Sequence, residues 1–88
     1  MYLVGIIKDV YTEDRYWADL RTVKQEALQD KTRRTNILKA IEAGMYKQFD
    51  IKADAQTLVD NEMDRAEADG MDWAQMWRSE TLSFKPNN

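Results

Sequence analysis

Residues 11–30 read YTEDRYWADLRTVKQEALQD, and the periodicity of this stretch decides the fold class that the sequence predicts. Thr12 is a suitable N-cap, and Glu13 and Asp14 follow where a helix dipole favours acidic side chains. The apolar side chains recur at steps of three and four residues, as on one face of a helix: Tyr16, Trp17, Leu20, Val23, Ala27 and Leu28. We therefore predict a first long helix here.

A second helix is predicted over residues 32–50, with Thr32 or Thr35 as its N-cap. Its apolar face consists of Ile37, Leu38, Ile41, Met45 and Phe49. Gly44 interrupts this pattern and lowers helix stability by roughly 1 kcal/mol relative to alanine. It indicates a close helix crossing, a bend or an early end of the helix.

A third helix is predicted over residues 54–69, from Asp54 as N-cap to Gly70 at the C′ position. Its apolar stripe is thin and consists of Leu58, Val59, Met63 and Ala66. A short fourth helix over residues 72–80 would place Trp73, Met76 and Trp77 on one side.

The two ends of the chain differ from this helical middle. Residues 2–11, YLVGIIKDVY, are rich in β-branched and aromatic side chains and favour a strand over a backward extension of the first helix. Residues 81–85, TLSFK, alternate and could form a second strand, and residues 85–88 are expected to fray. The predicted fold is a single mainly α-helical domain over residues 1–88, a small bundle of three to four short helices with a short β segment at the N-terminus.

The residue types present argue against catalysis and against metal binding. The 88 residues include no histidine and no cysteine, which removes the usual general base, the thiol nucleophile and most zinc sites. A calcium loop starting at Asp60 would need glycine at its sixth position, where Arg65 stands. We expect a protein that is not an enzyme and has no cofactor and no metal.

No secretion signal and no apolar stretch of membrane-spanning length is apparent in the sequence. The absence of cysteine also suits a reducing compartment. We expect a cytoplasmic protein that does not contact a membrane.

Charge is unevenly distributed along the chain, whose net charge is −3. Residues 31–52 carry six basic and two acidic side chains, whereas residues 53–88 carry three basic and eight acidic ones. The basic middle and the acidic end could pack together as complementary helices, or one of them could face a charged partner.

The candidate partner-binding site is the aromatic cluster of Trp73, Met76 and Trp77, because tryptophan and methionine are favoured in protein interfaces. Glu62 and Asp69 on the third helix would flank this cluster and attract a partner with a basic surface. The function predicted is that of a protein-binding adaptor, inhibitor or assembly factor, in the style of small phage proteins. The competing interpretation is that the tryptophans complete the core.

Two alternative functions follow from other stretches. The basic start of the second helix could bind nucleic acid, although the acidic pI of 4.9 argues against it; its candidate residues are Lys31, Arg33, Arg34 and Lys39. Residues 2–11 could instead form a homodimer through an apolar strand edge, which would make the chain a self-assembling subunit.

Overall fold

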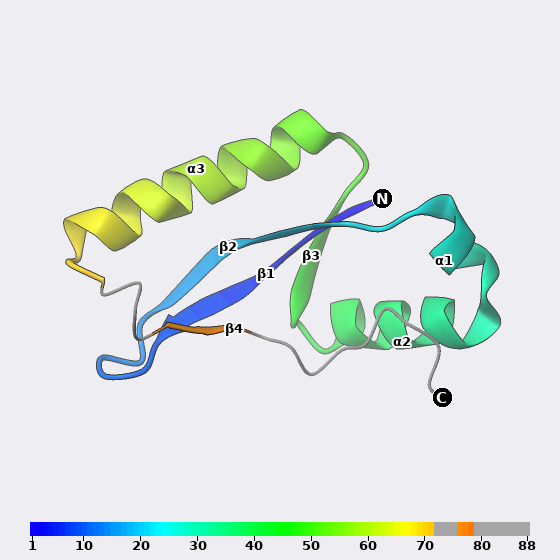
Figure 1. Cartoon of the computed structure of the whole chain (residues 1–88), viewed down its shortest axis with the longest axis horizontal. Coiled ribbons are helices and arrows are strands. Elements are labelled where there is room, and N and C mark those ends of the chain that lie inside the picture. Colours follow the sequence, from blue (N-terminus) through cyan, green and yellow to red (C-terminus); the bar gives the residue numbers. More distant parts are fainter. Residues whose placement is uncertain (72–75, 79–88) are drawn as a thin grey trace.

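The computed structural model describes residues 1–71 and the backbone of residues 76–78. In this part of the chain, four strands form one antiparallel sheet and three helices pack around it (Figure 1). In chain order the elements are β1 (Tyr2–Asp9), β2 (Arg15–Thr22), α1 (Gln25–Gln29), α2 (Lys31–Glu42), β3 (Tyr46–Phe49), α3 (Lys52–Ala68) and β4 (Met76–Arg78). The fold mixes helix and sheet, so the prediction of a mainly α-helical bundle is wrong.

Strand β1 is the centre of the sheet, and the strand predicted near the N-terminus is confirmed. It pairs with β2 over residues 2–8. Its other edge pairs with β3 over residues 2–5 and with β4 over residues 7–9, so that β3 and β4 follow one another along this edge. Because both edges of β1 have partners within the chain, the free edge on which we based a homodimer through residues 2–11 does not occur in the described structure.

Strand β2 lies where the first helix was predicted, and a bulge explains why the apolar spacing of this segment resembles that of a helix. Gly5 pairs with Asp19. The next residue of β1, Ile6, pairs with Trp17, so Ala18 is one residue too many in β2. A bulge breaks the two-residue period of a strand, and the apolar residues on its two sides then fall three and four positions apart, as on a helix. With β1 beside it to satisfy its backbone groups, this aromatic segment forms a strand.

Helix α2 is capped by a residue that the sequence analysis did not choose. The carboxylate of Asp30 accepts hydrogen bonds from the backbone N–H groups of Thr32 (3.0 Å) and Arg33 (3.1 Å). Thr32 and Thr35 are therefore inside the helix, and the predicted caps are wrong. A carboxylate at this position also offsets the unfavourable basic residues of the first turn.

Gly44 marks an early end of the predicted second helix, one of the three alternatives considered for it. Helix α2 ends at Glu42, and Gly44 has a φ of +78°, a conformation that glycine adopts far more readily than other residues. The chain reverses there, and β3 takes up residues that were predicted to be helical.

Helix α3 confirms the predicted third helix, with a different N-cap. It begins at Lys52 after Ile51 as N-cap, so Asp54 lies in the first turn and does not cap the helix. Gly70 follows the end of the helix with a φ of +75°, as predicted for a C′ residue.

The helices cover opposite faces of the sheet. Val4 of β1 packs against Ala55 and Val59 of α3. Its neighbour Leu3 points to the other face, because side chains alternate along a strand. There it joins the core under α1 and α2, which consists of Leu3, Val23, Ala27, Ile37, Ala40 and Tyr46.

Helix α3 also passes alongside β2, the edge strand of the sheet (Figure 1). Near its end, Ala66 packs against Ile7 and Tyr16, together with Met71. By alternation, Ile7 lies on the face opposite Val4, so α3 contacts one face near its start and the other near its end. The helix thereby covers the open edge of β2, one of the ways in which proteins protect an edge strand from aggregation.

Beyond residue 71, the predicted elements can be compared with the structure only at residues 76–78. Met76–Arg78 form strand β4, so a helix over residues 72–80 is wrong at these positions. Trp73, the strand predicted at residues 81–85 and the tail at residues 85–88 lie outside the described residues. None of the helices in the described part is both long and apolar enough to cross a membrane.

Candidate functional site

The loop between β1 and β2 is held in one shape by Asp9, whose side chain is buried. One carboxylate oxygen of Asp9 accepts hydrogen bonds from the N–H groups of Tyr11 (2.8 Å) and Thr12 (3.1 Å). The backbone of Asp9 accepts from the N–H of Glu13 (2.9 Å) and donates to the carbonyl of Asp14 (3.0 Å). These four bonds leave the loop little freedom to change its backbone conformation.

We call residues 10–14 the hairpin tip. Its two apolar residues are unusually exposed, Tyr11 by 75% and Val10 by 46% of their surface. Glu13 and Asp14 beside them are also exposed. The tip thus presents an aromatic ring and an aliphatic side chain next to two acidic groups, on a backbone that is already ordered.

Glu13 is the only residue other than glycine with a positive φ, at 62°, in the part of the chain that the structure describes. A left-handed conformation costs a glutamate roughly 1 kcal/mol, whereas glycine adopts it freely. The turn itself therefore does not require an acidic side chain at this position. Strained residues concentrate at functional sites, so this observation favours a role for the Glu13 side chain.

A second exposed surface lies on α2, and we call it the basic face. Lys31 and Arg34 are exposed there, and Leu38 beside them is exposed by 51%. Lys31, Arg34 and Leu38 follow at steps of three and four residues, which places them on one side of the helix. The basic face therefore has an apolar residue at its centre.

The fourth basic residue predicted for this stretch behaves differently. Arg33 is half-buried, and its Nε has no hydrogen-bond partner among the described residues. The N–H groups that could have held a phosphate at the start of α2 are instead bound by Asp30, as described above. Lys31 and Arg34 thus share an exposed surface with Leu38, Lys39 is exposed on another side of the helix, and Asp30 binds the backbone donors at the start of the helix.

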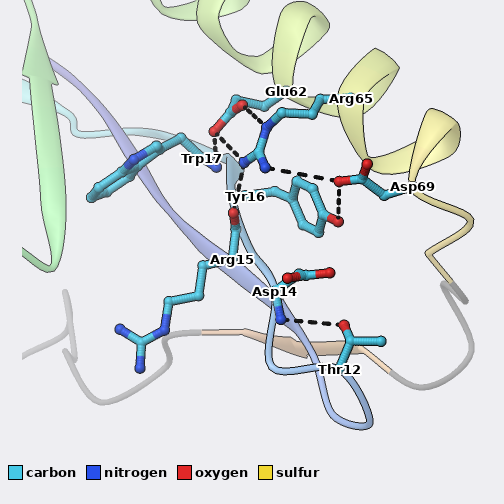
Figure 2. Close-up of polar contacts among 8 residues, drawn as sticks. All are labelled: Thr12, Asp14, Arg15, Tyr16, Trp17, Glu62, Arg65 and Asp69. Atoms are coloured by element: carbon cyan, nitrogen blue, oxygen red, sulfur yellow. Dashed lines mark hydrogen bonds and ion pairs between the residues drawn. The ribbon is translucent and has the colours of Figure 1, made fainter.

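Glu62 and Asp69, predicted to flank a partner-binding patch, lie in a partly exposed polar network between α3 and β2 (Figure 2). Glu62 accepts a hydrogen bond from the backbone N–H of Trp17 (3.0 Å) and another from Arg65 (2.8 Å). Asp69 accepts one from the hydroxyl of Tyr16 (2.9 Å). We call these side chains, with the backbone groups that they bind, the α3–β2 network.

Arg65 joins the two halves of this network. Its guanidinium donates to the backbone carbonyl of Arg15 (2.7 Å) and lies 4.4 Å from the centre of the Tyr16 ring (Figure 2). Together with Glu62, it satisfies backbone groups at the outer edge of β2, which has no neighbouring strand on that side. The network therefore fastens α3 to the sheet edge.

The ionisation of the network agrees with a structural role. Burial, followed by the hydrogen bond to Asp69, raises the pKa of Tyr16 to about 12, so that its hydroxyl stays protonated and donates. The hydrogen bond from Arg65 is the main cause that holds the pKa of Glu62 below its usual range, against the opposing effect of burial.

Among the described residues, no three His, Cys, Asp or Glu side chains are placed to hold a metal ion.

Of the partner-binding residues predicted from the sequence, the structure describes the side chains of Glu62 and Asp69 alone. Trp73 lies outside the described residues, and only the backbone of Met76 and Trp77 is described. The hairpin tip was missed, although the sequence carries a signal for it: DVYTED, residues 9–14, lies between two β-prone runs and is rich in turn-forming Asp and Thr.

Comparisons with protein-family models, curated proteins and solved structures find no match to this chain.

Proposed function

We propose that this chain is a non-enzymatic protein-binding module that contacts its partner through the hairpin tip. The observation that supports this proposal is an exposed tyrosine on a loop whose backbone is fixed by a buried carboxylate. Tyrosine is among the residues that contribute most to binding free energy in protein interfaces. An ordered loop also loses little conformational entropy when it binds.

The chemistry of the partner follows from the neighbours of Tyr11. Glu13 and Asp14 are exposed next to it, so a partner with an apolar recess bordered by basic side chains fits the tip. The tip thus combines aromatic and acidic side chains, the same combination that the sequence predicted around Trp73, Met76 and Trp77.

The surroundings of the acidic residues favour the hairpin tip over α3 as the site that contacts a partner. Glu62 and Asp69 are engaged with Trp17, Tyr16 and Arg65, so both carboxylates already have partners within the chain. Glu13 and Asp14 make no ion pair among the described residues and can attract a basic partner.

Site-specific photo-cross-linking in the native host tests the proposal. A benzoylphenylalanine in place of Tyr11 should give a discrete cross-linked species that is absent when the same group replaces Gln56, an exposed residue of α3. The species should weaken when Glu13→Lys is added, since the basic partner is then repelled. Equal cross-linking at both positions, or none at position 11, would contradict the proposal.

A further inference from the structure

The hairpin tip and the basic face lie at opposite ends of the molecule. In Figure 1, the loop between β1 and β2 is at one end of the long axis, and α2 is at the other end beyond β3. A single molecule therefore cannot bring its own tip to its own basic face. Any contact between these two surfaces has to join two molecules.

The two surfaces match each other in both apolar and charged character. The tip offers Tyr11 and Val10 with two acidic neighbours, and the basic face offers Leu38 with Lys31 and Arg34 on the same side of the helix. An apolar centre bordered by charges of opposite sign on the two sides is the usual arrangement of a specific interface.

We propose that the partner of the hairpin tip is a second copy of this chain, which receives the tip on the basic face of its α2. This inference depends on the proposed function, because it names the partner for the same tip. In the contact, Tyr11 of one copy lies against Leu38 of the next, and Glu13 and Asp14 face Arg34 and Lys31.

This association is heterologous, since two different surfaces meet. Any open chain of copies has an unoccupied tip at one end and an unoccupied basic face at the other. It therefore grows at both ends unless it closes into a ring. A five-residue loop against one helix buries less than the roughly 1,200 Å² of a typical stable interface. We therefore expect weak association, with a Kd of about 0.1 mM.

Two features of the basic face favour a protein over nucleic acid. Its central side chain is an exposed leucine, whereas interfaces with nucleic acid are more polar and far more positively charged than those between proteins. The acidic side chain of Asp30 occupies the start of α2, where a phosphate would have to approach. Nucleic-acid binding is accordingly an outcome of the test and not part of the proposal.

Sedimentation velocity of the full chain tests the proposal, at concentrations from about 10 µM to 1 mM so that the range brackets the expected Kd. Tyr11→Ser and Leu38→Ser should each raise the Kd by at least about tenfold, since each removes the apolar centre of one surface. Met63→Ser is the matched control, because Met63 is an exposed apolar residue of α3 outside both surfaces. Higher salt should weaken the wild-type association.

Mixing the two variants is the decisive measurement. The Leu38→Ser chain keeps its tip and the Tyr11→Ser chain keeps its basic face, so an equimolar mixture should form a 1:1 dimer and nothing larger. Circular dichroism verifies the fold of each variant, and Arg34→Glu replaces Leu38→Ser if that variant does not fold.

Three results would overturn the inference. The first is a wild type that stays monomeric at every concentration. The second is a Leu38→Ser chain that by itself associates as strongly as the wild type. The third is a mixed-sequence duplex that binds to α2 of a chain that stays monomeric. A monomeric chain that still yields a cross-link from position 11 to another protein would reject the second copy as partner and leave the proposed function standing.

Discussion

Two pairs of acidic side chains, one on α3 and one at the hairpin tip, have very different surroundings. Glu62 and Asp69 bind Trp17, Tyr16 and Arg65 across the edge of the sheet. Glu13 and Asp14 extend from an exposed loop, in which their backbones and not their carboxylates make the hydrogen bonds. The sequence shows four acidic residues of similar type, and only the tertiary structure separates those that hold the fold from those that are open to a partner.

The comparison extends to the tyrosines beside these acids. Tyr16 is buried with its hydroxyl bound to Asp69, whereas Tyr11 is exposed by 75%. We infer that burial and hydrogen bonding of Tyr16 stabilise the fold, whereas the apolar surface of Tyr11 would be buried only when a partner binds. Substitutions in the α3–β2 network should therefore change stability, and substitutions at the tip should change association.

The largest difference is expected between the two tyrosines. Tyr16→Ala should destabilise the fold by about 4 kcal/mol, because it leaves a large cavity where the buried ring was and removes the hydrogen bond to Asp69. Tyr11→Ala should stay within about 0.5 kcal/mol of the wild type, as surface substitutions usually do. Urea unfolding followed by circular dichroism measures both. Similar losses for the two variants would remove the distinction between network and tip.

The next largest effect is expected at Glu62, which accepts from both a backbone N–H and Arg65. Glu62→Ala should cost about 2 kcal/mol, since it leaves the N–H of Trp17 without its acceptor and removes one partner of the guanidinium of Arg65. Asp64 is an exposed acid on the same helix, and Asp64→Ala should be neutral or slightly stabilising because alanine is the better helix former. Equal effects at the two positions would show that the network does not hold α3.

These contrasts show which parts of the fold the sequence could predict. Strand β1 and the end of α3 follow from local signals, namely β-branched residues in one case and Gly70 in the other. Strand β2 does not, because the bulge at Ala18 gives a strand the apolar spacing of a helix. Only the pairing with β1, a long-range contact, decides between the two.

The candidate site was hidden by the same error. Thr12, Glu13 and Asp14 are good residues for the start of a helix, and equally good residues for a turn that hydrogen-bonds its own backbone. If these residues begin a helix, nothing in the sequence indicates that Tyr11 beside them is exposed on a hairpin loop. The engagement of Glu62 with Trp17 was likewise beyond reach, since the two residues are 45 positions apart.

The pH dependence of stability gives a smaller but more specific test of the network. Because the pKa of Glu62 is lowered in the folded state, its ionised form contributes stability above the ordinary value of 4.5. That contribution is lost as the pH falls through the lowered pKa. We expect the wild type to exceed Glu62→Gln by about 1 kcal/mol near neutral pH, with the difference shrinking below pH 4.5. A difference that is constant down to low pH would show that the charge of Glu62 does not matter.

The smallest effect on stability, and the sharpest separation of the two regions, is expected at Glu13. Its positive φ is unfavourable for glutamate, so Glu13→Gly should stabilise the fold by about 0.5 kcal/mol. The same change removes an acidic group from the tip and should weaken self-association in the sedimentation experiment. Glu67→Gly, at an exposed acid in α3, is the control and should lower stability by roughly 1 kcal/mol with association unchanged. If Glu13→Gly left association intact, the strained glutamate would have no role at the tip, and the acidic half of the proposed contact would be wrong.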